Sequence, residues 1–374
     1  IILGKTMVCS QLNYQIALTL LSGFGIASLR PLLERYNPAE IFNTPIRVLL
    51  ETPNVRPNCI QAIADFKDWD RVKKEIRFIE EKNIKTFFIT DPTYPFRLRE
   101  CADAPLLLYA RGELNLNPEK ILAIVGTRNN SQVGKRFTEE LLSAFQQHRD
   151  LVIISGLAAG IDTIAHQEAL RNQLPTLAVL AHGLDRIYPP INRRLAKDII
   201  DQGGSLLSEC RHGEAPDRFL FPRRNRIVAG LADATLVIES AVKGGSLITA
   251  NLAFNYGRSV FALPGRIYDE KSGGCLELLK TQKAQLITSA TDLLYWMNWN
   301  SEMQPQSASS KKSYTHLTEE ERNVIAHLKD GEIKHIDSIL ASTGMPPAQL
   351  ATILLNLSLA DHIVSLPGNK YQLI

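Results

Sequence analysis

The chain has 374 residues, of which 45% are hydrophobic and 22% are charged, and its formal net charge is +3. This length favours two or three globular domains, and the small net charge means that any affinity for nucleic acid must come from a local basic patch. Five scattered cysteines without a CxxC pair argue against a zinc ribbon or a disulfide framework. No apolar run is long enough to span a membrane, so we expect a cytoplasmic protein without membrane contact.

Residues 1–83 are predicted to form a helical domain. Apolar residues recur at helical spacing between residues 12 and 45, and a charged amphipathic helix is predicted over residues 60–83. Gly23 and Gly25 separate two of the short helices. Such a turn suits either simple helix packing, which we favour, or a helix–hairpin–helix contact with a DNA phosphate, for which the segment has few Lys or Arg.

Residues 84–300 are predicted to form an α/β domain with a doubly wound sheet. Near-continuous apolar strands alternate with helices, and such strands are typical of a parallel sheet that is covered on both faces. We expect the last strand at residues 259–265. Right-handed crossovers would bring the glycine turns that follow the strands to one edge of the sheet, where α/β proteins bind ligands. These turns contain Gly126, Gly156, Gly183, Gly244 and Gly245.

Three of the turns have the composition of a phosphate site. Glycine lets the backbone approach an anion, and free N–H groups at a helix start point toward it. The turn at Gly126 carries Arg128, which suits a bidentate contact with a phosphate or, alternatively, a bridge between two loops. It matches neither the dinucleotide fingerprint nor the Walker A loop, so we expect no nucleotide cofactor. The other two turns lie at residues 155–162 and 243–246.

An arginine cluster precedes the strand at residues 234–238, and its members are Arg223, Arg224 and Arg226. Its apolar flanks favour a place near the glycine turns over a merely exposed charged face. Aromatic residues nearby suit either stacking with unpaired bases or the core: Tyr188, Phe219 and Phe221. We predict that a polyanion, a strand of phosphates, is bound by Gly126, Thr127, Arg128, Ser155, Gly156, Leu157, Arg223, Asn225, Arg226, Lys243, Gly244, Gly245, Ser246 and Thr249.

Two pairs of titratable residues suit either a catalytic or a structural role. Asp162 and His166 stand four residues apart on a predicted helix, as metal ligands or an acid–base pair would, but no third ligand has matching spacing. We therefore favour structural hydrogen bonding. Glu209 and Glu239 end two strands without a nucleophile between them. No catalytic residue, metal ion or cofactor is predicted.

The C-terminal part is predicted to be a linker, residues 301–315, and a winged helix, residues 316–374. Three helices and a hairpin are expected, and Thr318 and Glu321 have the spacing of a capping box. The second apolar helix, at residues 347–359, contains no Lys or Arg. A partner-binding or structural role is therefore favoured over reading of the DNA major groove.

Taken together, these motifs resemble the DNA-processing protein A (DprA/Smf) family. The resemblance covers almost the whole chain and is densest between residues 124 and 265. It rests on VGTR at 125–128, SGLAAGIDTIAH at 155–166, GLDRIYPPINRRL at 183–195, FPRRNRIVAGL at 221–231, GGSLITA at 244–250 and GRSVFALPG at 257–265.

The resemblance implies an extended Rossmann-like domain that binds single-stranded DNA without sequence specificity, between a sterile-alpha-motif-like and a winged-helix domain. It implies a non-enzymatic protein that displaces single-strand-binding protein and loads the strand onto the RecA recombinase during natural transformation, usually as a homodimer. Arg128 matches the family's phosphate-contacting arginine, and the turn at Lys243 matches its lysine-bearing glycine loop.

The chain departs from the family pattern at Val133, where a Tyr is usual, and after the last strand at Leu276 and Lys283. These departures concern the pocket wall after the sheet. An alternative function is that of a nucleotide-processing enzyme related to phosphoribohydrolases. Their PGGxGT turn is replaced here by Lys243 and its glycines, and no Glu follows at the next turn.

Overall fold

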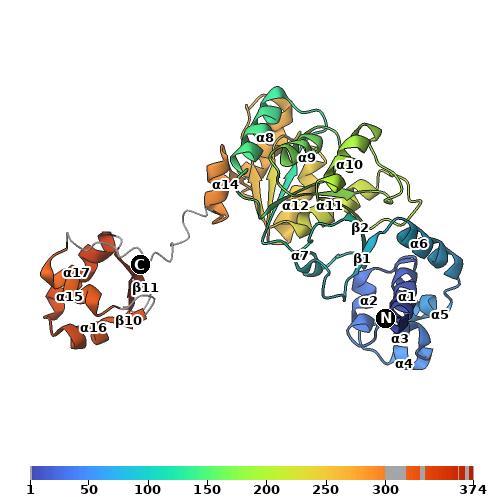
Figure 1. Ribbon diagram of the computed structural model, residues 1–374, viewed down its shortest axis with the longest axis horizontal. Helices are drawn as coiled ribbons and strands as arrows, with labels where there is room; N and C mark the ends of the chain where they lie inside the picture. The colour runs from blue at the N-terminus through green and yellow to red at the C-terminus, as the bar shows by residue number, and fades with distance from the viewer. Residues whose placement is uncertain (1, 300–316, 329–332, 361, 367–369, 374) are drawn as a thin grey trace. The chain divides into compact units, whose positions relative to one another are not determined.

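The computed structural model describes residues 2–299, 317–328, 333–360, 362–366 and 370–373 (Figure 1). The chain divides into two compact units, Ile1–Met297 and Asn298–Ile374, and each is described here by itself. The predicted linker at residues 301–315 lies outside the described residues. None of the helices that the structure describes combines the length and the hydrophobicity required to cross a membrane.

Six helices open the first unit: α1 (Ile2–Thr19), α2 (Ile26–Leu33), α3 (Pro38–Asn43), α4 (Ile46–Leu50), α5 (Pro57–Ala64) and α6 (Trp69–Glu81). The single helix predicted over residues 60–83 is wrong, because the chain turns between α5 and α6. This turn inserts Phe66 into an aromatic cluster, where its ring lies 5.1 Å from that of Trp69 and 5.7 Å from that of Phe42. Burial of these rings outweighs the continuation of the helical periodicity.

The helical region packs against the sheet domain through a continuous core that extends from Ile16 to Leu278. Buried polar contacts join the two as well. The backbone N–H of His212 donates to the Glu75 carboxylate at 2.9 Å, and the Arg211 guanidinium donates to the carbonyl of Thr19 at 3.1 Å. Residues 1–297 therefore behave as one compact unit.

The central sheet has nine strands in the order β1-β2-β6-β5-β4-β3-β7-β8-β9. Strands β1 and β2 pair antiparallel, as do β2 and β6, and the other pairs are parallel. The bounds are β1 Lys85–Phe88, β2 Leu107–Gly112, β3 Lys120–Val125, β4 Leu151–Ser155, β5 Thr176–Leu180, β6 Ser205–Ser208, β7 Ala234–Val237, β8 Ser259–Ala262 and β9 Gln285–Leu286. The predicted doubly wound α/β fold is confirmed, but β8 is not the last strand.

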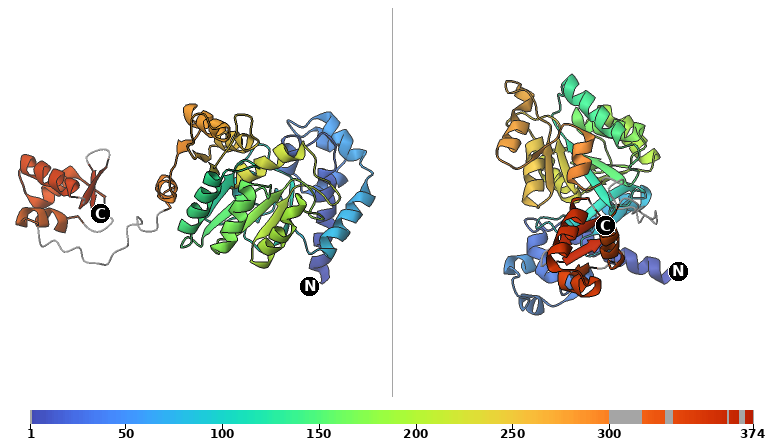
Figure 2. Two further views of the ribbon diagram at one scale, coloured as in Figure 1. Left: turned by 90° about the horizontal axis from the view of Figure 1, so that it is seen from above. Right: turned by 90° about the vertical axis from the view of Figure 1, so that its left-hand side faces the viewer.

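Helices cover both faces of this sheet, as the two views of Figure 2 show. Every residue of β4 and β5 is buried, which explains their uninterrupted apolar sequences. Because the chain runs from β3 outward to β6 and then returns to β7, the winding direction reverses at β3, and α/β sheets bind ligands beside such a point. The helices are α8 (Gln132–Ala144), α9 (Ile161–Arg171), α10 (Arg193–Asp201), α11 (Leu220–Leu231), α12 (Ser246–Asn255), α13 (Gly273–Lys280) and α14 (Ala290–Trp296), with the short α7 (Phe96–Arg99) before β2.

The second unit has the predicted winged-helix form. Its elements are α15 (Glu319–Ala326), β10 (Ile333–His335), α16 (Ile336–Thr343), α17 (Pro347–Leu359), β11 (Ile363–Leu366) and β12 (Lys370–Leu373). The capping box is confirmed, because Thr318 and Glu321 exchange side-chain-to-backbone hydrogen bonds at 2.9 and 3.2 Å. The three-residue strand β10 was not predicted; it pairs with β12 in a sheet of order β10-β12-β11.

Candidate nucleic-acid interface

A cavity of about 340 Å³ lies where β3, β4 and β7 end. Its walls are the turns after β3 and β4, one face of α11, and the turn that leads into α12. Nine of the residues predicted from the sequence line this cavity: Gly126, Thr127, Arg128, Gly156, Asn225, Gly244, Gly245, Ser246 and Thr249. The structure therefore brings the three glycine turns together at one edge of the sheet.

Ser155 and Leu157 belong to the second turn but face the interior. The Ser155 hydroxyl donates to the carbonyl of Ile124 at 2.6 Å, which ties β4 to β3. The side chain of Leu157 is fully buried, and its backbone has a φ of 53°. These two residues hold the turn in place and do not line the cavity.

Arg223 and Arg226 lie on the other side of α11. Both form ion pairs with the carboxylate of Glu209, at 3.0 Å for Arg223. They line a separate cavity of about 430 Å³ beside the N-terminal helices. The reason is helical geometry: residues 221, 224, 225 and 228 share the face toward the glycine turns, so positions 223 and 226 point away from it.

Arg224 was missing from the predicted contact residues, although it lines the cavity and organises its floor. It is only 5% exposed, and its guanidinium donates to the carbonyl oxygens of Gly156 and Val179. A Cβ at position 156 would lie 2.2 Å from this guanidinium, so a larger residue there would displace the Arg224 side chain. Burial, together with the charge of Arg128, lowers the pKa of Arg224, although the Asp162 carboxylate opposes this shift. The i+3 spacing from Phe221 was the signal that could have identified it.

Asp162 accepts hydrogen bonds from the backbone of the second glycine turn. Its carboxylate accepts the N–H groups of Gly156 at 3.1 Å and Ala158 at 3.3 Å. The N-cap residue of α9 is Gly160, and Asp162 lies in the first turn of the helix. Burial raises the pKa of Asp162, and Arg224 opposes that rise. Two amides of this turn thus already have an acceptor, and a phosphate there would have to use other groups.

Arg128 and Lys243 supply positive charge without a carboxylate partner among the described residues. The Arg128 side chain is exposed, and its guanidinium lies over the Phe221 ring, 5.1 Å from the centroid. Lys243 is exposed on the turn before α12, next to the lining residue Gly244. Two cations therefore flank the cavity, and neither is neutralised by an acid of the described chain.

The start of α12 completes the anion-binding arrangement. Its N-cap residue is Gly245, and no side chain caps the helix. The N–H groups of Gly245 and Ser246 have no acceptor within the described residues. The Ser246 hydroxyl donates to that of Ser240 at 2.8 Å, which fixes the turn. Uncapped amides and the positive end of the helix dipole favour a negatively charged ligand at this point.

The two strand-ending glutamates have separate structural roles. The Glu239 carboxylate accepts the backbone N–H of Ser131 at 2.8 Å and the Ser131 hydroxyl, at the start of α8. A Cβ at position 134 would lie 2.6 Å from this carboxylate, which explains Gly134. The Glu209 carboxylate forms ion pairs with Arg223 and Arg226 of α11. The structure provides no support for a catalytic pair.

The departures from the family pattern fall outside the residues that line the cavity. Val133 is 72% exposed, so its side chain packs little against the chain. The Lys283 ammonium donates to the Asn251 side chain on α12 at 2.8 Å, and Leu276 is half-buried on α13. The glycine turns are therefore formed without these positions.

His166 makes the structural hydrogen bond that the sequence favoured. Its Nδ1 lies 2.7 Å from the hydroxyl of Thr176, which donates to the carbonyl of Ile153. Nδ1 must therefore carry the proton, and the buried Nε2 has no hydrogen-bond partner among the residues that the structure describes. Burial, reinforced by the charge of Arg224, lowers the pKa of His166 to about 3. No group of three potential metal ligands occurs within the described part of the chain.

We expect the variant His166→Gln to lose stability less steeply in acid than the wild type. The unfolded histidine takes up a proton near pH 6.5 and the folded one only near pH 3, so stability falls as the pH is lowered through this window. At pH 5 this costs the wild type about 2 kcal/mol. Urea unfolding at pH 7 and pH 5 measures the difference, and equal losses for both proteins would contradict the assignment.

A smaller pocket of about 120 Å³ adjoins the main cavity and shares Arg128, Gly156, Ala158 and Phe221 with it. Aromatic rings form part of its wall: the centroids of Tyr188 and Phe221 lie 6.0 Å apart. The third predicted aromatic, Phe219, lies outside this pocket and is 69% exposed. Flat apolar surfaces thus lie next to the cationic cavity.

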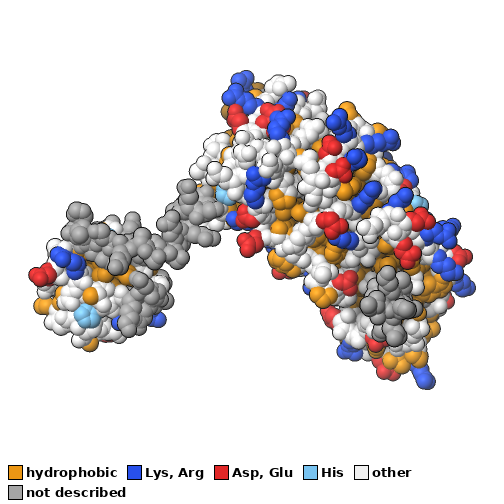
Figure 3. Space-filling view, viewed as in Figure 1, with side chains coloured by type: hydrophobic (Ala, Val, Ile, Leu, Met, Phe, Trp, Pro, Cys, Tyr) orange, Lys and Arg blue, Asp and Glu red, His pale blue; other side chains and the backbone are white. Residues whose placement is uncertain are grey.

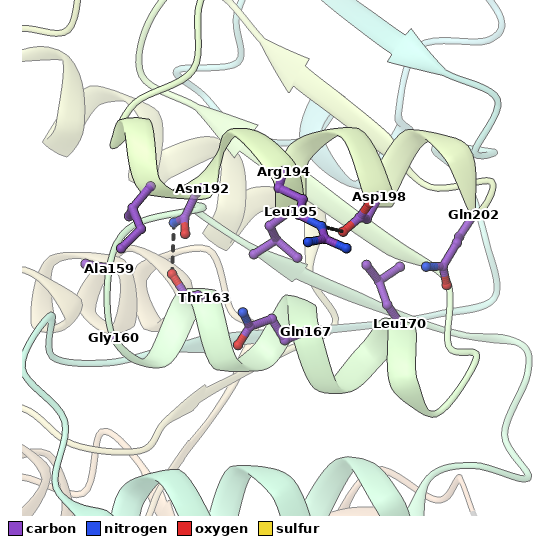
Figure 4. Close-up of a pocket in the computed structure, with 11 residues that line it drawn as sticks. Ala159, Gly160, Thr163, Gln167, Leu170, Asn192, Arg194, Leu195, Asp198 and Gln202 are labelled. Atoms are coloured by element: carbon purple, nitrogen blue, oxygen red, sulfur yellow. Dashed lines mark hydrogen bonds and ion pairs between the residues drawn. The ribbon is translucent and has the colours of Figure 1, made fainter.

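The groove between α9 and α10 is larger, at about 560 Å³, but its lining has little charge (Figure 4). Its one cation, Arg194, lies 3.9 Å from the carboxylate of Asp198, and Asn192 donates to Thr163 at 2.9 Å. Over the face that Figure 3 shows, acidic and basic side chains are interspersed. The cations at the glycine turns, Arg128 and Lys243, have no such carboxylate partner among the described residues, so the cavity at these turns suits a polyanion better than this groove does.

Comparison with known proteins places these features in a family. Residues 85–298 match the family model of DNA recombination-mediator protein A, and residues 308–369 match the DprA winged helix domain. The chain is 44% identical over 215 residues to DNA processing protein DprA of Streptococcus pneumoniae, which covers 58% of this chain and 75% of that protein. It is 34% identical to protein Smf of Escherichia coli over 81% of each chain.

Solved structures agree with these matches. DNA processing protein A from Streptococcus pneumoniae superposes with a TM-score of 0.64 at 37% identity, over 76% of this chain and 97% of that one. A DNA processing protein A from Helicobacter pylori, described with a single-stranded DNA binding mode, superposes with a TM-score of 0.52 at 31% identity, over 58% of this chain and 96% of that one. The chain therefore belongs to the DNA recombination-mediator protein A family, whose members are named DprA or Smf.

Proposed function

We propose that the protein binds single-stranded DNA without sequence specificity in the cavity at the ends of β3, β4 and β7. The observation that carries this proposal is the meeting of three positive features at one site. Arg128 and Lys243 have no acidic partner among the described residues, and the uncapped start of α12 lines the same cavity as Arg128. The single-stranded DNA binding described for the Helicobacter pylori relative supports it.

The shape of the site suits an unpaired strand. The cavity of about 340 Å³ takes backbone phosphates, and the adjoining pocket of about 120 Å³ presents Tyr188 and Phe221 to part of a base. A base reaches such rings only when it is unstacked, and stacking on an aromatic ring contributes about 1–3 kcal/mol whatever the base. Oligothymidine is therefore expected to bind tightly and duplex DNA to compete poorly.

The same residues favour binding over catalysis. Asp162 is the one carboxylate that lines the cavity, and its oxygen already accepts two backbone amides beside Arg224. A phosphoribohydrolase-like reaction needs a carboxylate that is free to act at the sugar. Release of free base from nucleoside monophosphates would favour this alternative function over the proposed one.

We extend the proposal to the later steps that membership of a recombination-mediator family suggests. The protein, as a homodimer, would displace single-strand-binding protein and load the strand onto the RecA recombinase during natural transformation. The test is RecA-dependent strand exchange on DNA already coated with single-strand-binding protein. Addition of this protein should remove the delay before strand exchange begins. Addition of the variant Arg128→Ala should leave that delay unchanged.

We expect the affinity for oligothymidine to fall with rising salt concentration as it does when a protein neutralises two phosphates, here through Arg128 and Lys243. Each contributes about −0.7 to the slope of log affinity against log salt concentration, so the slope should be about −1.4. Between 50 mM and 200 mM salt, affinity should then fall about sevenfold. Fluorescence anisotropy measures this, and a slope near zero would mean that Arg128 and Lys243 do not contact phosphates.

A further inference from the structure

The loop that follows β8 exposes two consecutive apolar side chains, and it starts at the same edge of the sheet as the turn after β7, which leads into the proposed DNA site. Tyr268 is 99% exposed and Ile267 is 79% exposed, and neither is used by the site described above. Val242, on the turn after β7, is 63% exposed. Single exposed apolar residues are ordinary, but three of them on two segments that contact each other suit an interaction surface.

This loop is fixed to the wall of the cavity. The backbone N–H of Ser240 donates to the carbonyl of Lys271 at 2.7 Å, and the N–H of Gly274 donates to the carbonyl of Ser240 at 2.7 Å. A Cβ at position 273 would lie 2.9 Å from the Val242 side chain, so the segments touch. Because Ser240 also lines the cavity, the loop and the cavity share one wall.

Internal hydrogen bonds define the shape of the loop. The N–H of Asp269 donates to the carbonyl of Arg266 at 3.1 Å, and the Asp269 carboxylate accepts the N–H of Lys271 at 3.1 Å. The turn therefore presents Tyr268 at its tip without contact to the core. Because the backbone of the turn is already ordered, only the freedom of the Tyr268 side chain is lost when a flat partner stacks on its ring.

The charges around Tyr268 favour a nucleic-acid partner. Lys243, Arg266 and Lys271 lie on the two touching segments, and the salt bridges found among the described residues include none of the three. The acids of the loop are Asp269, whose carboxylate caps the following turn, and Glu270. The local excess is one positive charge, which suits a strand with its base on the ring and its phosphate near the cations.

We propose that Tyr268 is a stacking platform for a further base of the same single strand, next to the cavity at the glycine turns. This proposal rests on the proposed function. Tyr268 would add affinity through its ring, whereas Arg128 adds it through charge. The expected ligand is therefore an unpaired base of any identity, attached to a phosphate that already occupies the cavity.

The test is the binding of a fluorescein-labelled 20-residue oligothymidine to the full chain and to Tyr268→Ala, Tyr268→Phe and Arg128→Ala. We expect Tyr268→Ala to weaken binding about fivefold or more, the effect of losing one base–aromatic stack. Tyr268→Phe keeps the ring and should bind within about twofold of the wild type. On an abasic strand of equal length, Tyr268→Ala and the wild type should bind alike. Strands with 5-iodouracil should crosslink to Tyr268 under light.

The outcomes separate the two proposals. If Arg128→Ala weakens binding and Tyr268→Ala does not, the platform is refuted and the cavity stands. If neither variant weakens binding, the strand lies elsewhere and both proposals fail. An equal loss on normal and abasic strands would show that Tyr268 acts on the fold or the backbone and not by stacking. A change in molecular mass by sedimentation, with DNA affinity unchanged, would place Tyr268 between two copies of the chain and overturn the platform.

Discussion

Replacing Arg128 with alanine is expected to weaken oligothymidine binding by about 10- to 150-fold, which corresponds to one charge-assisted hydrogen-bonded contact of about 1.5–3 kcal/mol. The side chain is exposed, lies on the Phe221 ring and has no ion pair among the described residues, so its removal should leave the fold intact. The variant Arg128→Lys keeps the positive charge but lacks the planar guanidinium, so its affinity for oligothymidine should lie between those of the wild type and Arg128→Ala. Anisotropy at fixed salt, with thermal unfolding as a check, measures the effect.

Arg149→Ala is the matched control. Arg149 is also exposed, and it precedes the amino end of β4, whereas the cavity lies beyond the carboxyl end of that strand. The control should bind like the wild type. Lys243→Ala should weaken binding less than Arg128→Ala, because an ammonium makes no fork with phosphate oxygens. Equal affinity of Arg128→Ala and Arg149→Ala would remove the cavity from the proposal.

Much of the first unit could be predicted from the order of its apolar segments and glycines. The alternation of strands and helices between residues 120 and 262 can be predicted, because the parallel strands are apolar and buried and glycines mark the turns that follow them. The break before α6 could not be read in this way. It depends on Phe66, whose packing against the Phe42 ring of α3 is a contact distant in sequence.

The candidate site could likewise be predicted only in part. Glycine turns after successive parallel strands must meet at one edge of the sheet, and nine predicted residues do line one cavity. Sequence proximity misled at α11, where three arginines in four residues were treated as one cluster. Helical geometry directs Arg224 inward and Arg223 to Glu209, and the composition of the cluster does not contain this information.

Replacing Arg224 with methionine is expected to destabilise the protein by about 3–5 kcal/mol, because two buried carbonyl oxygens lose their donor and the buried Asp162 carboxylate loses a nearby positive charge. The guanidinium is buried and serves the carbonyls of Gly156 and Val179, while its charge faces Asp162. Without it these acceptors would be buried unpaired, and the turn after β4 would lose its support. Urea unfolding measures the change in the free energy of unfolding.

Arg223→Met is the matched control for this prediction, since it removes a neighbouring arginine from the same helix. Arg223 is about half exposed, and Arg226 continues to pair with Glu209 in its absence, so the expected cost is about 0–1 kcal/mol. Adding Asp162→Asn to Arg224→Met should recover part of the loss, because the remaining buried charge is then removed. If the two single arginine variants are equally stable, Arg224 does not support the turn, and the cavity floor must be held by the glycine backbone alone.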